Sequence, residues 1–101
     1  MTFRELALSF PNSIEQAHFN KTSFRVNKKI FATLNKNESE VVLKLSLIDQ
    51  DVFNKMSSGI FSPVANKWGR HGWTVVELKN VDMDMLKDGL KCAYDEVLKA
   101  K

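Results

Sequence analysis

The 101-residue sequence contains few of the residues that cross-link or interrupt a chain: one cysteine, two prolines and four glycines. The single thiol, Cys92, cannot form an intramolecular disulfide, and unpaired thiols are typical of reducing compartments. The longest early uncharged run, from Leu6 to Ile14, is short, is broken by Pro11 and follows no basic stretch. These features argue against a signal peptide and a membrane span, and they predict a cytoplasmic protein with no membrane partner.

Motifs for catalysis are also missing. The four glycines are scattered, and none precedes a Lys-Ser or Lys-Thr pair as a phosphate-binding loop requires. No Gly-x-Ser-x-Gly sequence is present to form the nucleophile elbow used in acyl transfer. We therefore predict a binding protein rather than an enzyme.

Residues that bind metals are equally sparse. His18, His71 and Cys92 are the only soft ligands, and their separations match no zinc motif. The aspartates between residues 82 and 88 surround the start of a predicted helix, where capping and the helix dipole already account for acidic residues. We predict no metal site and no cofactor.

The composition is that of an ordinary globular protein, with 44% hydrophobic and 27% charged residues. The length suits one domain, which we place over residues 1–101. Helices are predicted at both ends. Thr2 and Glu5 form a capping box ahead of an apolar stripe that Pro11 ends. The last helix opens at Val81-Asp82, and its stripe faces the core with Leu86, Leu90, Ala93 and Val97.

Between these helices the pattern changes to short runs of β-branched and aromatic residues, over residues 22–26, 30–34, 41–47 and 72–78. A short helix is predicted over residues 49–56, with Ile48, Val52, Phe53 and Met56 on one side. The element order is therefore α-β-β-β-α-β-α. It predicts an α+β fold, a single two-layer domain in which helices pack on an antiparallel sheet.

Asn27-Lys28 is a candidate two-residue hairpin turn, although the second position of such a turn favours glycine. This turn would place Phe24 opposite Phe31, and it would put Arg25 on one face with Ile30, Ala32 and Leu34. Both faces of the sheet would then carry apolar groups. The sequence leaves this register open.

Charge is unevenly distributed in a chain whose net charge is +3. No acidic residue lies between Glu15 and Glu38 or between Asp51 and Glu77. These two acid-free windows are favourable for binding a polyanion, with a solvated charged surface as the competing interpretation. Their cations are Lys21, Arg25, Lys28, Lys29 and Lys36 in the first window, and Lys55, Lys67 and Arg70 in the second.

Several segments together resemble one family. The chain is similar to the MmcQ/YjbR-like proteins, small bacterial domains most of which have no established activity. Lys28 departs from the family's pattern, which usually has glycine at this turn. The resemblance spans nearly the whole chain and is carried by residues 23–27, 29–34, 42–45, 72–75 and 84–94.

The resemblance implies a compact α+β fold like those of frataxin-like (CyaY-like) proteins and type III secretion chaperones, with a double-wing arrangement proposed to bind DNA. The first predicted helix offers little acid beyond Glu5, whereas frataxins carry an acidic ridge there. The net positive charge also differs from that of the acidic chaperones. Electrostatics therefore disfavours both of these functional analogies.

Our leading hypothesis is a nucleic-acid-binding module with DNA as its candidate partner, or a regulatory module, that attracts phosphates without reading bases. The alternative is a protein-interaction or dimerisation domain that uses a partly apolar open sheet face. In the leading hypothesis the phosphate contacts are Lys21, Arg25, Lys28, Lys29 and Lys36, extended by Lys67 and Arg70.

Overall fold

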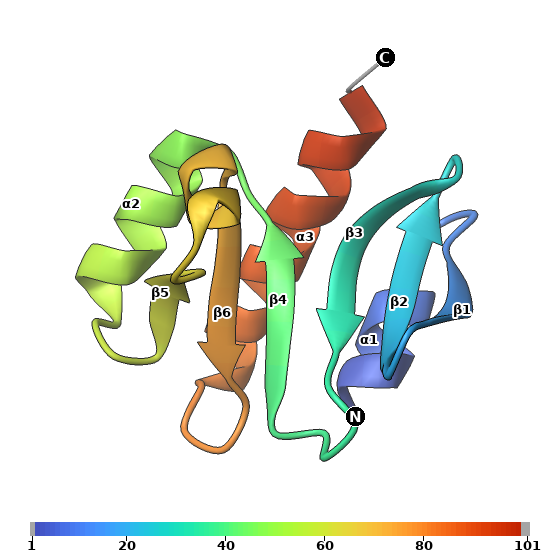
Figure 1. Cartoon of the computed structure of the whole chain (residues 1–101), viewed down its shortest axis with the longest axis horizontal. Coiled ribbons are helices and arrows are strands. Elements are labelled where there is room, and N and C mark those ends of the chain that lie inside the picture. The colour runs from blue at the N-terminus through green and yellow to red at the C-terminus, as the bar shows by residue number, and fades with distance from the viewer. Residues whose placement is uncertain (1, 100–101) are drawn as a thin grey trace.

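The chain forms a six-stranded antiparallel sheet with strand order β1-β2-β3-β4-β6-β5, together with three α-helices (Figure 1). The structure is a computed structural model and describes residues 2–99. It confirms the α+β class, and β1 and β5 are additional to the predicted strands. The elements are α1 (Phe3–Leu8), β1 (Ile14–His18), β2 (Lys21–Val26), β3 (Lys29–Leu34), β4 (Glu40–Lys44), α2 (Leu47–Met56), β5 (Phe61–Pro63), the 3-10 helix η1 (Lys67–His71), β6 (Trp73–Glu77) and α3 (Met83–Lys99).

The capping box at the start of α1 is confirmed. The Thr2 amide donates to the Glu5 carboxylate over 2.9 Å, and the Glu5 amide donates to the Thr2 hydroxyl over 3.1 Å. Hydrogen bonding of the carboxylate to Thr2, first of all to its backbone amide, lowers the pKa of Glu5. Two amide groups that the helix itself leaves unpaired are thereby satisfied, which fixes where α1 begins.

Helices α1 and α3 cover one face of the sheet and lie behind it in Figure 1. The predicted stripe of α3 is buried from Leu86 to Val97. Tyr94 stacks on Phe10 at 4.8 Å between ring centroids, and its hydroxyl donates to the Pro11 carbonyl over 2.6 Å. This bond ties α3 to the loop that follows α1, and the core therefore joins both ends of the chain.

The hairpin between β2 and β3 has the predicted two-residue turn. Asn27 and Lys28 both have positive φ, 52° and 68°, as a type I′ turn requires. Beyond the turn the structure settles the register that the sequence left open. It departs from that of a regular hairpin because a β-bulge intervenes: Arg25 pairs with Ile30, but Phe24 pairs with Ala32. The extra residue in β3 is Phe31, which is buried. Ala32 therefore lies on the helix-covered face rather than beside Arg25.

The helix α2 has its buried side where we did not expect it. Gln50 and Phe53 face inward, whereas Ile48, Val52 and Met56 are 77%, 45% and 64% exposed. The Gln50 amide is satisfied in the interior by oxygen acceptors on η1 and β6, which is why a polar residue takes a core position. Within residues 2–99, no helix has the length and apolar character needed to cross a bilayer.

Candidate functional site

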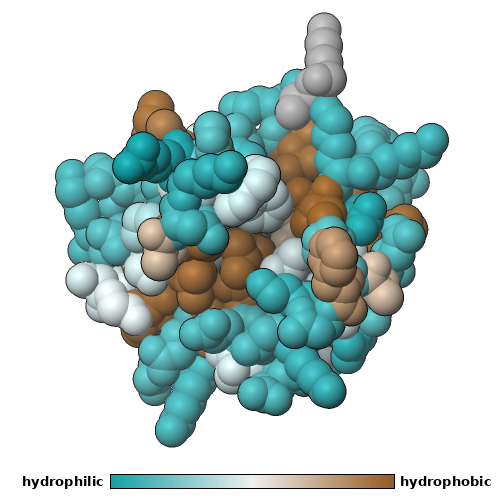
Figure 2. Space-filling view, in the orientation of Figure 1, coloured by the Kyte–Doolittle hydropathy of each residue, from teal (hydrophilic) through white to brown (hydrophobic). Residues whose placement is uncertain are grey.

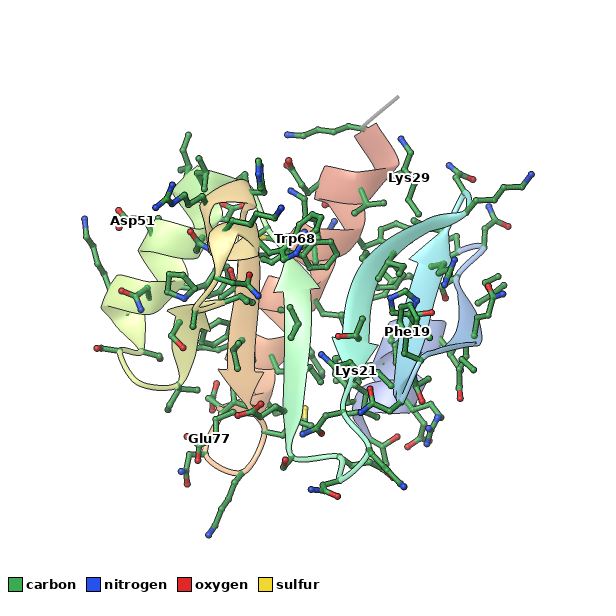
Figure 3. All side chains as sticks on the ribbon, in the orientation of Figure 1. Phe19, Lys21, Lys29, Asp51, Trp68 and Glu77 are labelled. Carbon is green, nitrogen blue, oxygen red and sulfur yellow. The ribbon has the colours of Figure 1, made fainter. Side chains whose placement is uncertain are left out.

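The second face of the sheet carries no α-helix, only the short η1 at one end, and is turned toward the viewer in Figures 1 to 3. Strand pairing places one row of mostly short side chains across its middle. Figure 2 shows hydrophobic side chains in the centre of this open face with hydrophilic ones around them. This arrangement makes the open face the surface on which a ligand has room to lie. From β1 to β5 the row is Gln16, Ser23, Thr33, Val42, Val75 and Ser62.

A groove of about 470 Å³ lies on the open face, within the size range of ligand sites. Its floor is formed by Ile30, Thr33 and Val42. One rim comes from the turn between β1 and β2, and the other comes from the segment between β5 and β6. None of the residues that line it is acidic. The first rim consists of His18, Phe19 and Lys21, and the second of Val64, Asn66, Trp68 and Trp73.

Phe19 is the most exposed large hydrophobic residue of the described chain, with 94% of its surface accessible. It occupies the first position of the turn between His18 and Lys21, with φ of 58°. A left-handed backbone costs an L-residue about 1–2 kcal/mol, and a bulky side chain rarely adopts it. The structure therefore holds an aromatic ring in solvent at a cost in both hydration and backbone strain.

Trp68 on the opposite rim is positioned by a dense set of hydrogen bonds. The Asn66 side chain accepts from the Trp68 amide over 2.9 Å and begins η1. The buried Gln50 amide lies 3.0 Å from the Gly69 carbonyl and 3.2 Å from both the Trp73 carbonyl and the Thr74 hydroxyl. The backbone of this rim is therefore fixed to α2 and β6, while the Trp68 indole remains 53% exposed.

Lys44 is a cation of the open face that the sequence analysis did not single out. It pairs with Trp73 across β4 and β6, and its ammonium donates to the His71 carbonyl over 2.7 Å. The alternation of buried and partly exposed residues along β4 places Val42 and Lys44 on the same face. That alternation was available in the sequence and is the signal that would have identified Lys44.

The structure divides the seven predicted phosphate contacts between the two ends of the sheet. Lys21 lines the groove, and Arg25 lies on the same face with its guanidinium 3.0 Å from the Ser23 hydroxyl. Lys36 lies in the loop that follows β3, at the end of the sheet where β2 begins with Lys21. Four of the predicted cations flank the end of the sheet at which β3 and β6 begin: Lys28, Lys29, Lys67 and Arg70.

The groups considered as metal ligands are separated. His18 lines the groove, whereas Cys92 is half-buried in α3, where burial raises the pKa of its thiol. Among residues 2–99, no three His, Cys, Asp or Glu side chains lie close enough to hold a metal ion together.

Comparison with known families shows which family the chain belongs to. The sequence model of the YjbR family matches residues 8–96, which include every residue that lines the groove. The chain belongs to the YjbR family. The resemblance noted in the sequence is thereby confirmed. No curated protein matches this YjbR chain.

A solved structure supports the fold of this YjbR chain. This chain is similar to the crystal structure of the Deinococcus radiodurans protein DR2400, whose family-model domain is DUF419, with a TM-score of 0.82 and 20% sequence identity. The match covers 95% of this chain and 75% of the other. At this level of identity the likeness shows the shared fold.

Proposed function

We propose that this YjbR-family protein is a nucleic-acid-binding module that can bind DNA, and that its ligand lies on the open face of the sheet. The observation that carries the proposal is the groove, because it combines exposed aromatic rings with a cation and contains no acid. Aromatic side chains beside a positive surface are the common arrangement for binding nucleic acid strands. We assign the protein a binding role rather than a catalytic one.

The cations on the open face support this proposal. Lys21, Arg25 and Lys44 project from β2 and β4 on this side, and none of them forms an ion pair within residues 2–99. The described ion pairs instead lie elsewhere, three of them within α2 or α3. Cations without carboxylate partners are free to neutralise phosphates and release their counterions.

Fluorescence anisotropy with labelled DNA over a salt series tests the proposal. Each neutralised phosphate contributes about −0.7 to −0.9 to the slope of log K against log salt concentration. Lys21→Ala is therefore expected to weaken binding and reduce that slope by about 0.7–0.9. Lys87→Ala removes the same charge from an exposed site on α3 and serves as the matched control. If the protein shows no DNA binding at low salt, the proposal is refuted.

A second function is favoured by the exposed stripe on α2. Ile48, Val52 and Met56 recur every four residues along one side of the helix, and exposed apolar patches of this kind mark protein contacts. We propose a second copy of this chain as the occupant, because pairing of two α2 helices would bury the same stripe on both copies. Light scattering tests it: Val52→Asp is expected to leave monomers only, and a wild-type monomer at high concentration would refute it.

We place this alternative on α2. Phe31 is 0% exposed, so it lies in the core and not on the open sheet face. A charge at Phe31 would unfold the core rather than break a contact. The α2 stripe and the groove are therefore separate surfaces and can be tested independently.

A further inference from the structure

We infer that the groove on the open face binds single-stranded nucleic acid, with unpaired bases stacked on Phe19 and Trp68, in preference to a duplex. This inference rests on the proposed function and names the class of nucleic acid that the groove accepts. It extends the sequence hypothesis, which invoked attraction of phosphates alone.

The first argument is the placement of the two rings. Phe19 and Trp68 belong to opposite rims of one groove, on segments separated by almost half of the chain. Figure 3 shows Phe19 in front of β2 and Trp68 in front of the end of β4, with the middle of the sheet between them. Two rings that flank a shallow floor offer stacking surfaces to bases that lie across the sheet.

The second argument is that packing does not account for either ring. Phe19 is 94% exposed, and its ring lies 4.8 Å from the imidazole of His18, its neighbour in the chain. Trp68 is 53% exposed and has the ammonium of Lys67 at 5.9 Å from its centroid. An aromatic ring with a cation beside it can stack on a base while the cation contacts the phosphate of the same strand.

The third argument is the shape of the ligand. In a duplex the π faces of the bases are stacked on one another, and a protein meets phosphates and base edges. An intact duplex therefore offers no free base face to Phe19 or Trp68, and the sheet face presents no α-helix to a groove of DNA. An unpaired strand exposes both its bases and its phosphates. The floor of Ile30, Thr33 and Val42 adds apolar contact, and Lys21 meets a phosphate at the rim.

The experiment compares an oligothymidylate of about a dozen nucleotides, the duplex it forms with oligoadenylate, and thymidine monophosphate, at one salt concentration. Binding is read by anisotropy for the labelled strands and by tryptophan fluorescence for all three. We expect the single strand to bind more tightly than the duplex. The monophosphate should bind more weakly than the oligomer if the groove holds a strand. Tighter binding of the monophosphate would overturn the inference in favour of a free-nucleotide site.

Substitutions separate stacking from general hydrophobic contact. Phe19→Leu and Trp68→Leu are each expected to weaken single-strand binding by about 5- to 150-fold, the range measured when a stacking ring is lost. Phe19→Tyr keeps the ring and should retain affinity. Leu98→Ala shortens an exposed apolar side chain on α3 and is the control. Because all three positions are exposed, circular dichroism should show unchanged folding.

The outcomes distinguish the two levels of proposal. If the duplex binds at least as tightly as the single strand and the leucine variants bind like the wild type, the inference fails while nucleic-acid binding stands. If neither form of DNA binds at low salt, the proposed function fails together with the inference. Loss of single-strand affinity in both leucine variants, with Phe19→Tyr active, supports the inference.

Discussion

Replacing Lys28 by glycine should stabilise the protein, because Lys28 has φ of 68° at the second position of a type I′ turn. A left-handed conformation costs an L-residue about 1–2 kcal/mol. Glycine avoids this cost but loses about 0.5–1 kcal/mol more conformational entropy on folding than alanine does. The difference leaves a gain of about 0.5–1 kcal/mol in the free energy of unfolding, which corresponds to a rise in Tm of roughly 2–8 °C for a domain of this size.

Urea titration and calorimetry measure this gain, and Lys28→Ala is the matched control. Alanine removes the same charge but keeps a Cβ at positive φ, so Lys28→Ala should show no such gain. The two variants also share any loss of phosphate contact, and their DNA affinities should agree. If Lys28→Gly were no more stable than Lys28→Ala, the turn would not be strained and the reasoning would be refuted.

Three further substitutions test how the structure is held together. Gly72→Ala should lower the free energy of unfolding by about 3 kcal/mol in urea titration, because φ is 96° and the new Cβ would overlap the Leu45 carbonyl oxygen. Tyr94→Phe should cost about 1 kcal/mol in thermal unfolding, since it removes the 2.6 Å bond to Pro11. Burial, followed by the nearby Asp49, raises the pKa of Cys92 in the folded state. The Cys92 thiol therefore contributes to stability below the ordinary thiol pKa, and this contribution declines as pH rises through the pKa of the folded state. Cys92→Ala should remove the decline, which urea titrations across this pH range would measure.

The elements that the sequence predicted well are those with local signals. Thr2 and Glu5 mark the start of α1 because a capping box involves residues three apart. The stripe of α3 is regular over about three turns, and the two-residue turn at Asn27 is set by the residues next to it. Each of these features depends on a few neighbouring residues, and the sequence displays them directly.

The two strands that the sequence did not predict lack such signals. All but the last residue of β1 is exposed, so Ile14–His18 shows no alternation of buried and polar residues. The strand β5 has three residues and ends at Pro63, and it exists because Phe61 pairs with Val76 in the core. Their positions follow from the rest of the sheet rather than from their own residues.

The candidate site was predicted only in part. The acid-free windows identified Lys21 and the segment that contains Trp68, but no sequence pattern related Phe19 to Trp68. These residues meet because β2, β3, β4 and β6 are neighbours in the sheet, which is a property of the whole fold. The exposed stripe of α2 was hidden for a similar reason: Gln50 is buried only because η1 and β6 supply acceptors for its amide.

The bulge in β3 connects the core to the open face. In a regular hairpin Phe31 would pair with Phe24, and Ala32 and Leu34 would share the open face with Arg25. The extra residue instead gives the helix-covered side Phe31, Ala32 and Leu34, all buried, and turns Thr33 outward to the groove floor. One inserted residue thus supplies a ring to the core and places Thr33, rather than Ala32, opposite Ser23 on the groove floor. The register that builds the core is therefore also the condition for the binding surface.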